Sequence, residues 1–164
     1  MKYPFNDKNI LEQASFSGHL YPGNKQETEI PVVLLMTSYP PRECGIATYS
    51  QDLILALNKQ FDHSFEIQVC AFETGLMDYE YPEEVSDVLQ TDIPVEYALL
   101  AQRINENERI CLVLLQHEFG FFQLTDDTFQ KFIQALEKPL ITVFHTVLPQ
   151  PDTFRITTIQ QIVG

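Results

Sequence analysis

The sequence has few cysteines and few basic residues, and each shortage excludes a class of protein. Its 3 cysteines are odd in number and form no Cys-x-x-Cys pair, so neither a disulfide framework nor a zinc site is indicated. Only 10 lysines and arginines stand against 23 aspartates and glutamates, which gives a formal net charge of -13. A chain of that charge is repelled by phosphate backbones and anionic lipid surfaces, and we expect no nucleic-acid partner.

Long apolar runs and nucleotide-loop motifs are missing as well. Apolar stretches such as residues 110–115 fall far short of the roughly 20 residues that cross a bilayer. The first residues also lack the apolar core of a signal peptide. With few cysteines and no such segment, we expect a cytoplasmic protein without a transmembrane helix. Because neither Gly-x-Gly-x-x-Gly nor a Walker loop occurs, we expect no dinucleotide or ATP cofactor.

What the sequence does contain is an ordinary globular composition, with 45% hydrophobic and 20% charged residues in 164. This length suffices for one domain with a sizeable core. Residues 1–29 are mixed and polar with no sustained period, and we interpret them as an N-terminal extension. Residues 30–164 are predicted to form the domain.

Strand and helix patterns alternate along residues 30–164. Apolar or alternating runs predict strands at 31–36, 66–72, 85–89, 110–115 and 139–144. Apolar spacings of three and four predict helices at 46–61, 95–107 and 126–136, and a last helix is expected after Pro151. The stripe predicted for the first helix comprises Ile46, Tyr49, Leu53, Ile54, Leu57 and Phe61. The alternation predicts an α/β fold, a Rossmann-like three-layer sandwich with a mainly parallel sheet.

In such sheets ligands bind outside the carboxyl ends of the strands, and three loops there carry unusual residues. The loop at 37–45 places Gly45 where a helix begins, with Arg42 beside it, so its backbone amides are suited to a phosphate or a sugar hydroxyl. His117 and Glu118 follow a second strand, and His145 follows a third. No third ligand is spaced for a metal site.

Each of these features also has an ordinary structural interpretation. A lone glycine before a helix is more often a turn than a ligand cradle, and a histidine at a strand end commonly satisfies backbone groups. If His117 and His145 point into one cleft, they can donate to a sugar or phosphate while Glu118 accepts from an acceptor hydroxyl. Core packing is the simplest interpretation of the apolar patch at 119–122, and the alternatives are that it stacks on a sugar or packs against another domain.

Three motifs, in order, resemble those of family 4 glycosyltransferases. SYPPRECGIATYSQDLILAL resembles the family's opening motif, in which a strand runs through a proline-rich turn into Gly-Ile-Ala and an amphipathic helix. LLQHEFGFF resembles its Gln-His-Glu motif, and PLITVFHTVLPQP resembles its strand followed by His-Thr-Val-Leu-Pro. The resemblance extends from about residue 31 to 151.

The resemblance implies half of a GT-B fold, the acceptor-side domain of a retaining glycosyltransferase (a hexosyltransferase). Such an enzyme transfers a sugar from a nucleotide-diphosphate sugar to a carbohydrate or lipid-linked acceptor, usually without an essential metal. The expected partner domain, a C-terminal donor domain with a Glu-x7-Glu element, has no counterpart within the 164 residues. This fragment alone is therefore expected to be inactive.

Residue roles follow from the matched motifs. Gly45 and Ile46 match the loop whose backbone reaches the donor phosphate or sugar, and His145 matches the histidine near the reacting centre, which makes it the expected catalytic residue. The other expected substrate-binding residues are Arg42, Thr48, His117 and Glu118.

A different class of function is a free-standing, non-catalytic α/β ligand-binding or interaction module. It predicts a polar surface over the strand ends, whereas the enzyme half predicts that Phe119, Phe121 and Phe122 are partly exposed. A phosphate-receiver domain is less favoured, because no paired aspartates follow the first strand. The sequence does not name the sugar, its nucleotide or the acceptor.

Overall fold

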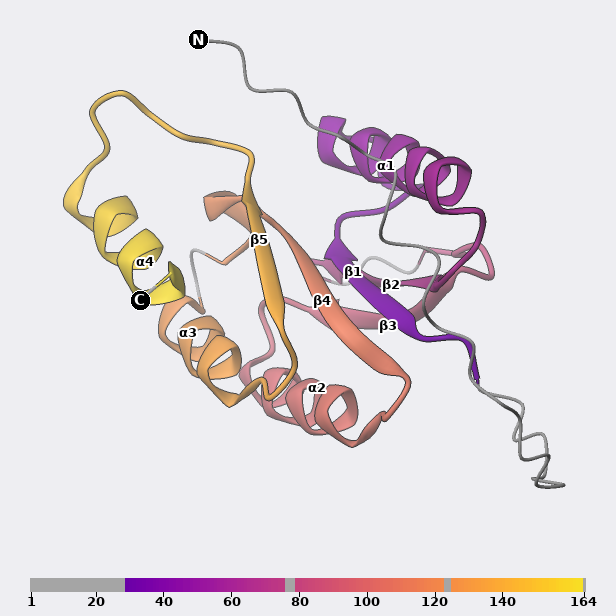
Figure 1. Cartoon of the computed structure of the whole chain (residues 1–164). Coiled ribbons are helices and arrows are strands. Elements are labelled where there is room, and N and C mark those ends of the chain that lie inside the picture. The colour runs from indigo at the N-terminus through magenta and orange to yellow at the C-terminus, as the bar shows by residue number, and fades with distance from the viewer. Residues whose placement is uncertain (1–28, 76–78, 123–124, 164) are drawn as a thin grey trace, which may run out of the picture.

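A computed structural model of the chain describes residues 29–75, 79–122 and 125–163. It contains one sheet of five parallel strands in the order β3-β2-β1-β4-β5, with helices on both faces (Figure 1). The strands are β1 Val32–Thr37, β2 Glu66–Glu73, β3 Val85–Gln90, β4 Ile110–His117 and β5 Leu140–Phe144. The helices are α1 Gly45–Phe61, α2 Pro94–Glu106, the short 3-10 helix η1 Phe119–Phe121, α3 Asp126–Ala135 and α4 Thr153–Val163.

This architecture confirms the predicted α/β fold and every predicted strand and helix. The central strand β1 is buried along its whole length and pairs in parallel with β2 on one side and β4 on the other. Burial on both faces explains why its sequence is a continuous apolar run rather than an alternating one. The predicted extension lies outside the described residues, except for Glu29.

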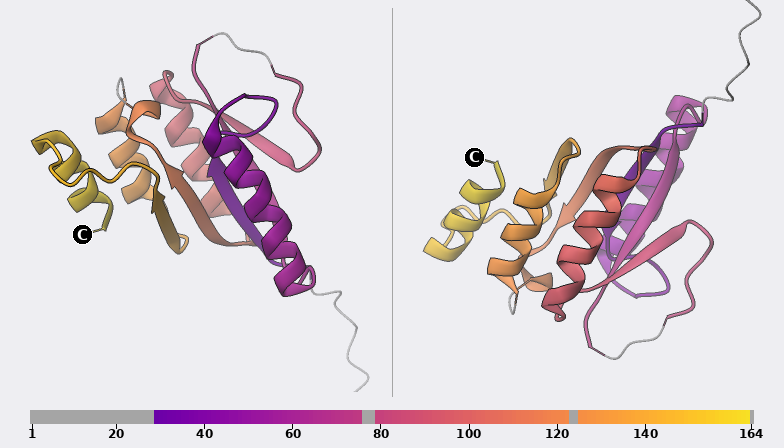
Figure 2. Two further views of the ribbon diagram at one scale, coloured as in Figure 1. Left: turned by 90° about the horizontal axis from the view of Figure 1, so that it is seen from above. Right: turned by 90° about the horizontal axis from the view of Figure 1, so that it is seen from below.

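The helices form two outer layers of unequal size. Helix α1 covers one face of the sheet, while α2 and α3 cover the other, as the two views of Figure 2 show. Helix α4 lies beside α3 (Figure 1), where the Thr158 hydroxyl donates to the Asp126 carboxylate at 3.4 Å. The sheet therefore has a small core cluster under α1 and a larger one under α2 and α3.

The packing face of α1 differs from the predicted apolar stripe. The buried residues are Ala47, Ser50 and Ile54, whereas Tyr49 is 44% exposed. The Ser50 and Thr37 hydroxyls are hydrogen-bonded at 2.7 Å, which joins the helix to β1. Small side chains let the helix lie close to the sheet, and a buried hydroxyl is tolerated because it has a partner. Tyr49 is thereby turned toward the carboxyl end of β5.

The core under α2 and α3 is rich in aromatic rings. Phe122 and Phe129 stack with centroids 3.8 Å apart, and Phe132 extends the stack from α3. Phe72 from β2 meets Phe122 edge-on at 5.4 Å. These contacts attach the segment after β4 to the sheet and to α3, so they set the position of the loop that follows His117.

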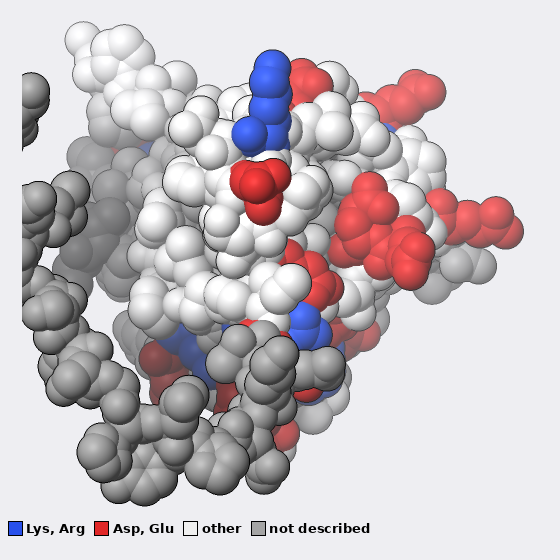
Figure 3. All heavy atoms as spheres, turned by 45° about the vertical axis from the view of Figure 1, so that its right-hand side comes forward, with Lys and Arg blue, Asp and Glu red and all other residues white. Residues whose placement is uncertain are grey.

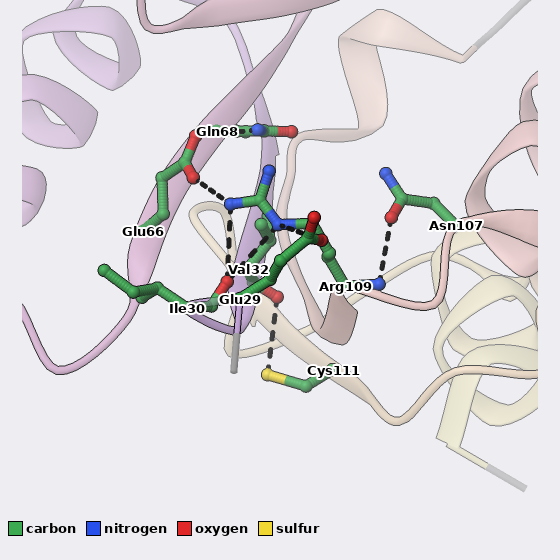
Figure 4. Close-up of polar contacts among 8 residues, drawn as sticks. All are labelled: Glu29, Ile30, Val32, Glu66, Gln68, Asn107, Arg109 and Cys111. Carbon is green, nitrogen blue, oxygen red and sulfur yellow. Dashed lines mark hydrogen bonds and ion pairs between the residues drawn. The ribbon is translucent and has the colours of Figure 1, made fainter. Parts of the chain in front are cut away.

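At the opposite, amino-terminal edge of the sheet, Arg109 links the starts of three strands (Figure 4). Its guanidinium donates to the Ile30 carbonyl at 3.3 Å and forms ion pairs with Glu66 and, at 3.6 Å, with Glu29. Exposed ion pairs of this kind contribute about 1 kcal/mol or less. The edge that carries the candidate site is the other one, where the strands end.

We predict that Phe129→Ala destabilises the protein by about 3–5 kcal/mol, because a fully buried, stacked ring is replaced by a cavity. Urea unfolding followed by circular dichroism measures the change. Leu55→Ala, on the exposed side of α1, is the matched control and is expected to cost well under 1 kcal/mol beyond the helix-propensity difference. Equal losses in both variants would contradict the assignment of Phe129 to the core.

Candidate functional site

The sheet reverses its winding direction at β1, and open α/β sheets bind their ligands at the carboxyl edge beside such a reversal. From β1 the chain crosses to β2 through α1, whereas later crossovers through α2 and α3 run on the opposite face and in the opposite direction. The loops after β1 and β4 therefore diverge. The predicted site residues lie on these two loops and on the one after β5.

The first loop brings the amino end of α1 to this carboxyl edge. Pro40 and Pro41 follow β1 and have no N–H for a strand ladder, so pairing stops there. Cys44 caps the helix: its Sγ accepts from the Ala47 amide at 3.4 Å and lies 3.0 Å from the Ser38 hydroxyl.

Gly45, the first helical residue, is exposed, and a Cβ added there would meet nothing within 4 Å. No described residue therefore fills the space beside Gly45, at the positive end of the α1 dipole. Ile46 follows it and is half-buried. Thr48 is exposed and its hydroxyl donates to the Cys44 carbonyl at 3.5 Å.

His145 is held from two sides at the end of β5. Its Nε2 lies 2.7 Å from Oε1 of Gln116, and its ring meets the edge of Tyr49 with centroids 5.1 Å apart. Its backbone amide donates to the His117 carbonyl at 3.0 Å, which continues the β4–β5 ladder. The imidazole therefore lies on the α1 face of the sheet, near the first turns of that helix.

Gln116 and Tyr49 are the site residues that sequence reasoning missed. Gln116 is 0% exposed within β4, and Tyr49 was assigned to the packing stripe of α1. A signal for Gln116 was present, because it is a carboxamide directly after an otherwise apolar run. Its partner, however, is 29 residues away and is not visible in the sequence.

His117 points to the opposite face from His145. It is 1% exposed and lies among the rings of Phe119, Phe122, Phe129 and Phe144, with centroids 4.8 to 5.6 Å from its own. This burial lowers the pKa of His117 to about 4, which keeps the imidazole neutral. The structure does not bring the two histidine rings into one cleft. His117 is paired with Phe144 and shares its face, and His145, the next residue, points to the other face.

Glu118 and Arg42 both have partners within the chain. The Glu118 carboxylate accepts a hydrogen bond from the Thr146 hydroxyl, which ties the loop after β4 to the loop after β5. Arg42 donates to the Phe72 carbonyl at 3.3 Å, and its guanidinium carbon lies 5.1 Å from the centre of the Phe121 ring. Arg42 therefore lies over the end of β2, while Glu118 and His145 lie at the ends of β4 and β5.

Core packing, the simplest interpretation of the phenylalanine patch, is confirmed for Phe119 and Phe122, and the partial exposure expected of an enzyme half is seen only for Phe121. Phe119 is 4% and Phe122 is 2% exposed, because both pack against His117 and the aromatic core, while Phe121 is partly buried. The exposed apolar side chains near this edge belong instead to Val147 and Leu148, directly after His145. The apolar flank lies on the loop after β5.

Away from this edge, the described surface carries acidic patches and a groove. In the face shown in Figure 3 acidic side chains gather in patches and basic ones are sparse. A groove of about 680 Å³ between α2 and α3, lined by Tyr97, Ala101 and Phe132 among others, lies on the opposite face from α1. In the described ranges no three His, Cys, Asp or Glu residues are grouped to hold a metal ion, and no helix has the length and apolar character that a bilayer crossing requires.

Comparison of the chain with protein families, with curated proteins and with solved structures found no significant match.

The buried histidine predicts a pH-dependent stability. The folded pKa of His117, about 4, lies below the usual 6.5, so the unfolded chain binds the extra proton between these values. The free energy of unfolding is therefore expected to be highest above pH 6.5 and to fall by about 3 kcal/mol as the pH is lowered toward 4.

Urea unfolding of wild type and His117→Phe at about pH 7 and pH 4.5 measures this effect. The phenylalanine variant keeps the ring among its aromatic neighbours and loses the titrating group, so the difference between the proteins isolates His117 from the other acids and histidines. Parallel pH profiles for the two proteins would show that His117 does not titrate in this way.

Proposed function

We propose that this chain is the acceptor-side domain of a retaining glycosyltransferase, which transfers a sugar from a nucleotide-diphosphate sugar to a carbohydrate or lipid-linked acceptor. The proposal includes a donor-binding domain that follows in the same protein and a cytoplasmic location, in keeping with free Cys44, Cys70 and Cys111. It begins from the three motifs that resemble family 4 glycosyltransferases.

The main support for this proposal is that the amino end of α1 and His145 lie on the same face of the sheet. The open amino end of α1 at Gly45 and the imidazole of His145 share the α1 face of one carboxyl edge, because Tyr49 of the same helix contacts that imidazole. Open α/β sheets bind their ligands at this edge. All three motifs meet in space at this edge, since His145 of the third contacts Tyr49 of the first and Gln116 of the second.

The chemistry of these groups suits sugar transfer. Negative charge builds up on the leaving diphosphate as the glycosidic bond breaks, and free amides at a helix amino end favour such charge. His145 provides a hydrogen-bonding group for the transferred sugar or the acceptor hydroxyl, since one ring nitrogen remains unengaged by the described residues. Ile46 and Thr48, in the first turn of α1, make further contacts with the substrate in this proposal.

Two of the expected substrate contacts have a smaller part in this proposal. His117 lies within an aromatic cluster and fixes the shape of the loop after β4, and Glu118 acts with Thr146 as a bridge between two loops. Arg42 lies over Phe121, and in this proposal its guanidinium supplies a positive charge near the carboxyl edge of the sheet.

The alternative is a free-standing, non-catalytic ligand-binding or interaction module. The burial of Phe119 and Phe122 favours it, because an enzyme half without its second domain was expected to leave these rings exposed. The exposed Val147 and Leu148 favour the enzyme half instead.

Two measurements separate these functions. The first reads the gene downstream of the codon for Gly164 and assays the encoded protein for hydrolysis and transfer with common nucleotide-diphosphate sugars. The second titrates the same compounds into the ¹⁵N-labelled chain and follows the amides of Gly45 and Ile46. A second Rossmann-like domain with donor turnover supports the proposal, whereas a stop codon with no turnover and no amide shifts points to the interaction module.

In the protein that contains the proposed donor domain, His145→Ala is expected to reduce transfer by at least 100-fold, because the group next to the reacting centre is lost. The imidazole is half-buried at a strand end, so the fold should persist. His63→Ala, an exposed histidine beyond the far end of α1, is the control and should transfer at the wild-type rate. Undiminished transfer by His145→Ala would remove this residue from the active site.

Gly45→Val tests close approach of the donor. A valine there has room in the free protein, and the backbone is not in the left-handed region, so folding should change little. Its methyl groups, however, occupy the space beside the helix amino end, and we expect KM for the donor to rise on the order of tenfold or more. Ala56→Val adds the same side chain on the exposed middle of α1 and should leave KM unchanged.

A further inference from the structure

We propose that Gln116 is a positioning residue for His145: its carbonyl oxygen holds the hydrogen of the imidazole on Nε2 and leaves Nδ1 as the nitrogen that faces substrate. The tautomer and orientation follow from the position of the Gln116 oxygen against Nε2 of the imidazole. Their role in sugar transfer rests on the proposed function.

The contact defines the tautomer. Oε1 of Gln116 lies 2.7 Å from Nε2 of His145, and a carboxamide oxygen is an acceptor without a hydrogen to give. The hydrogen therefore resides on Nε2. A neutral imidazole carries one N–H, so Nδ1 is a lone-pair acceptor, and the side-chain hydrogen bond of His145 to a described residue is made through Nε2 instead.

Gln116 is well placed to hold another group in position. It lies in β4, which pairs with β1 on one side and β5 on the other, and opposite Val143 in the ladder with β5. Its side chain is fully buried, so its rotamer is restricted by packing. The amide therefore presents its oxygen from a rigid strand in the interior of the sheet.

The cost of burying this amide argues for a specific role. Its Nε2 has no hydrogen-bond partner among the described residues, and a buried donor left unpaired costs about 1–3 kcal/mol. An apolar side chain, as at neighbouring Leu114 and Leu115, avoids that cost in the same strand. The single hydrogen bond to His145 is the interaction that the carboxamide gains at this position.

Two further contacts restrict the imidazole. The Tyr49 ring meets it edge-on with an interplanar angle of 80°, and the His145 backbone amide donates to the His117 carbonyl. The Glu118 carboxylate, the nearby charged acceptor, takes the Thr146 hydroxyl instead. Gln116 is thus the side chain that determines which ring nitrogen carries the hydrogen.

The tautomer is measured directly with long-range ¹H–¹⁵N correlation spectra of the histidine-labelled chain at about pH 8. The signals of His145 are assigned by their absence from the spectrum of His145→Asn. We expect the Nε2–H pattern, with slow exchange of that hydrogen with water because its partner is buried. An Nδ1–H pattern in the wild type would overturn the proposal.

Isosteric variants test the role of the oxygen. Gln116→Met keeps the length and removes the acceptor, so the two tautomers should mix and the Nε2 hydrogen should exchange faster. Gln116→Glu keeps an acceptor oxygen at the same reach and should keep a hydrogen on Nε2, while its negative charge also favours a second proton on Nδ1. Gln134→Met, on the exposed side of α3, is the control for the substitution itself. A wild-type pattern in a folded Gln116→Met variant would contradict the proposal.

These measurements distinguish a loss of folding from a loss of turnover. If Gln116→Met does not fold, as thermal unfolding will show, the wild-type and Gln116→Glu spectra still decide the tautomer. In the protein with donor turnover, Gln116→Met should lower kcat on the order of 100-fold with little change in KM for the donor, and Gln116→Glu should recover part of that loss. Turnover absent from wild type would reject the proposed function while the spectra still test the positioning by Gln116.

Discussion

Every part of this structure depends on the position of β1 between two parallel neighbours. Its backbone N–H and C=O groups are paired with β2 on one side and β4 on the other, and both of its faces are covered. A strand in that position leaves no polar face. Since right-handed crossovers to its two sides must run on opposite faces, the same pairing separates α1 from α2 and α3 and makes the loops after β1 and β4 diverge at the carboxyl edge.

Because successive side chains of a strand point to opposite faces of the sheet, the residues at this edge lie in two different environments. Gln116 and His117 are neighbours in β4, yet one binds the His145 imidazole on the α1 face and the other lies among aromatic rings on the opposite face. Burial among those rings makes the pKa of His117 low and its imidazole neutral. Of two histidines at strand ends, therefore, only His145 is in a position to meet a ligand on the α1 face.

The strands could be predicted from the sequence because a single physical rule, the burial of apolar side chains, determines where they lie. The strands β1 and β4 are continuous apolar runs because both of their faces are covered, and hydrophobic periodicity detects that condition. It failed for the face of α1, because the apolar residue Tyr49 is turned outward while Ser50 is buried on a hydroxyl of β1. A prediction from hydrophobicity places a serine at the surface. The burial of Ser50 is explained by its hydrogen bond to the Thr37 hydroxyl.

The sequence by itself determined the α/β class, the order of the elements and the three loops that end at one edge, since these follow from local periodicity and from the turn residues between elements. Only the tertiary structure decided which side chains meet there. Gln116 and His145 are 29 residues apart, and Thr37 and Ser50 are 13 apart. Such pairs depend on strand order, on register and on the face that each residue occupies, and these are set by long-range packing.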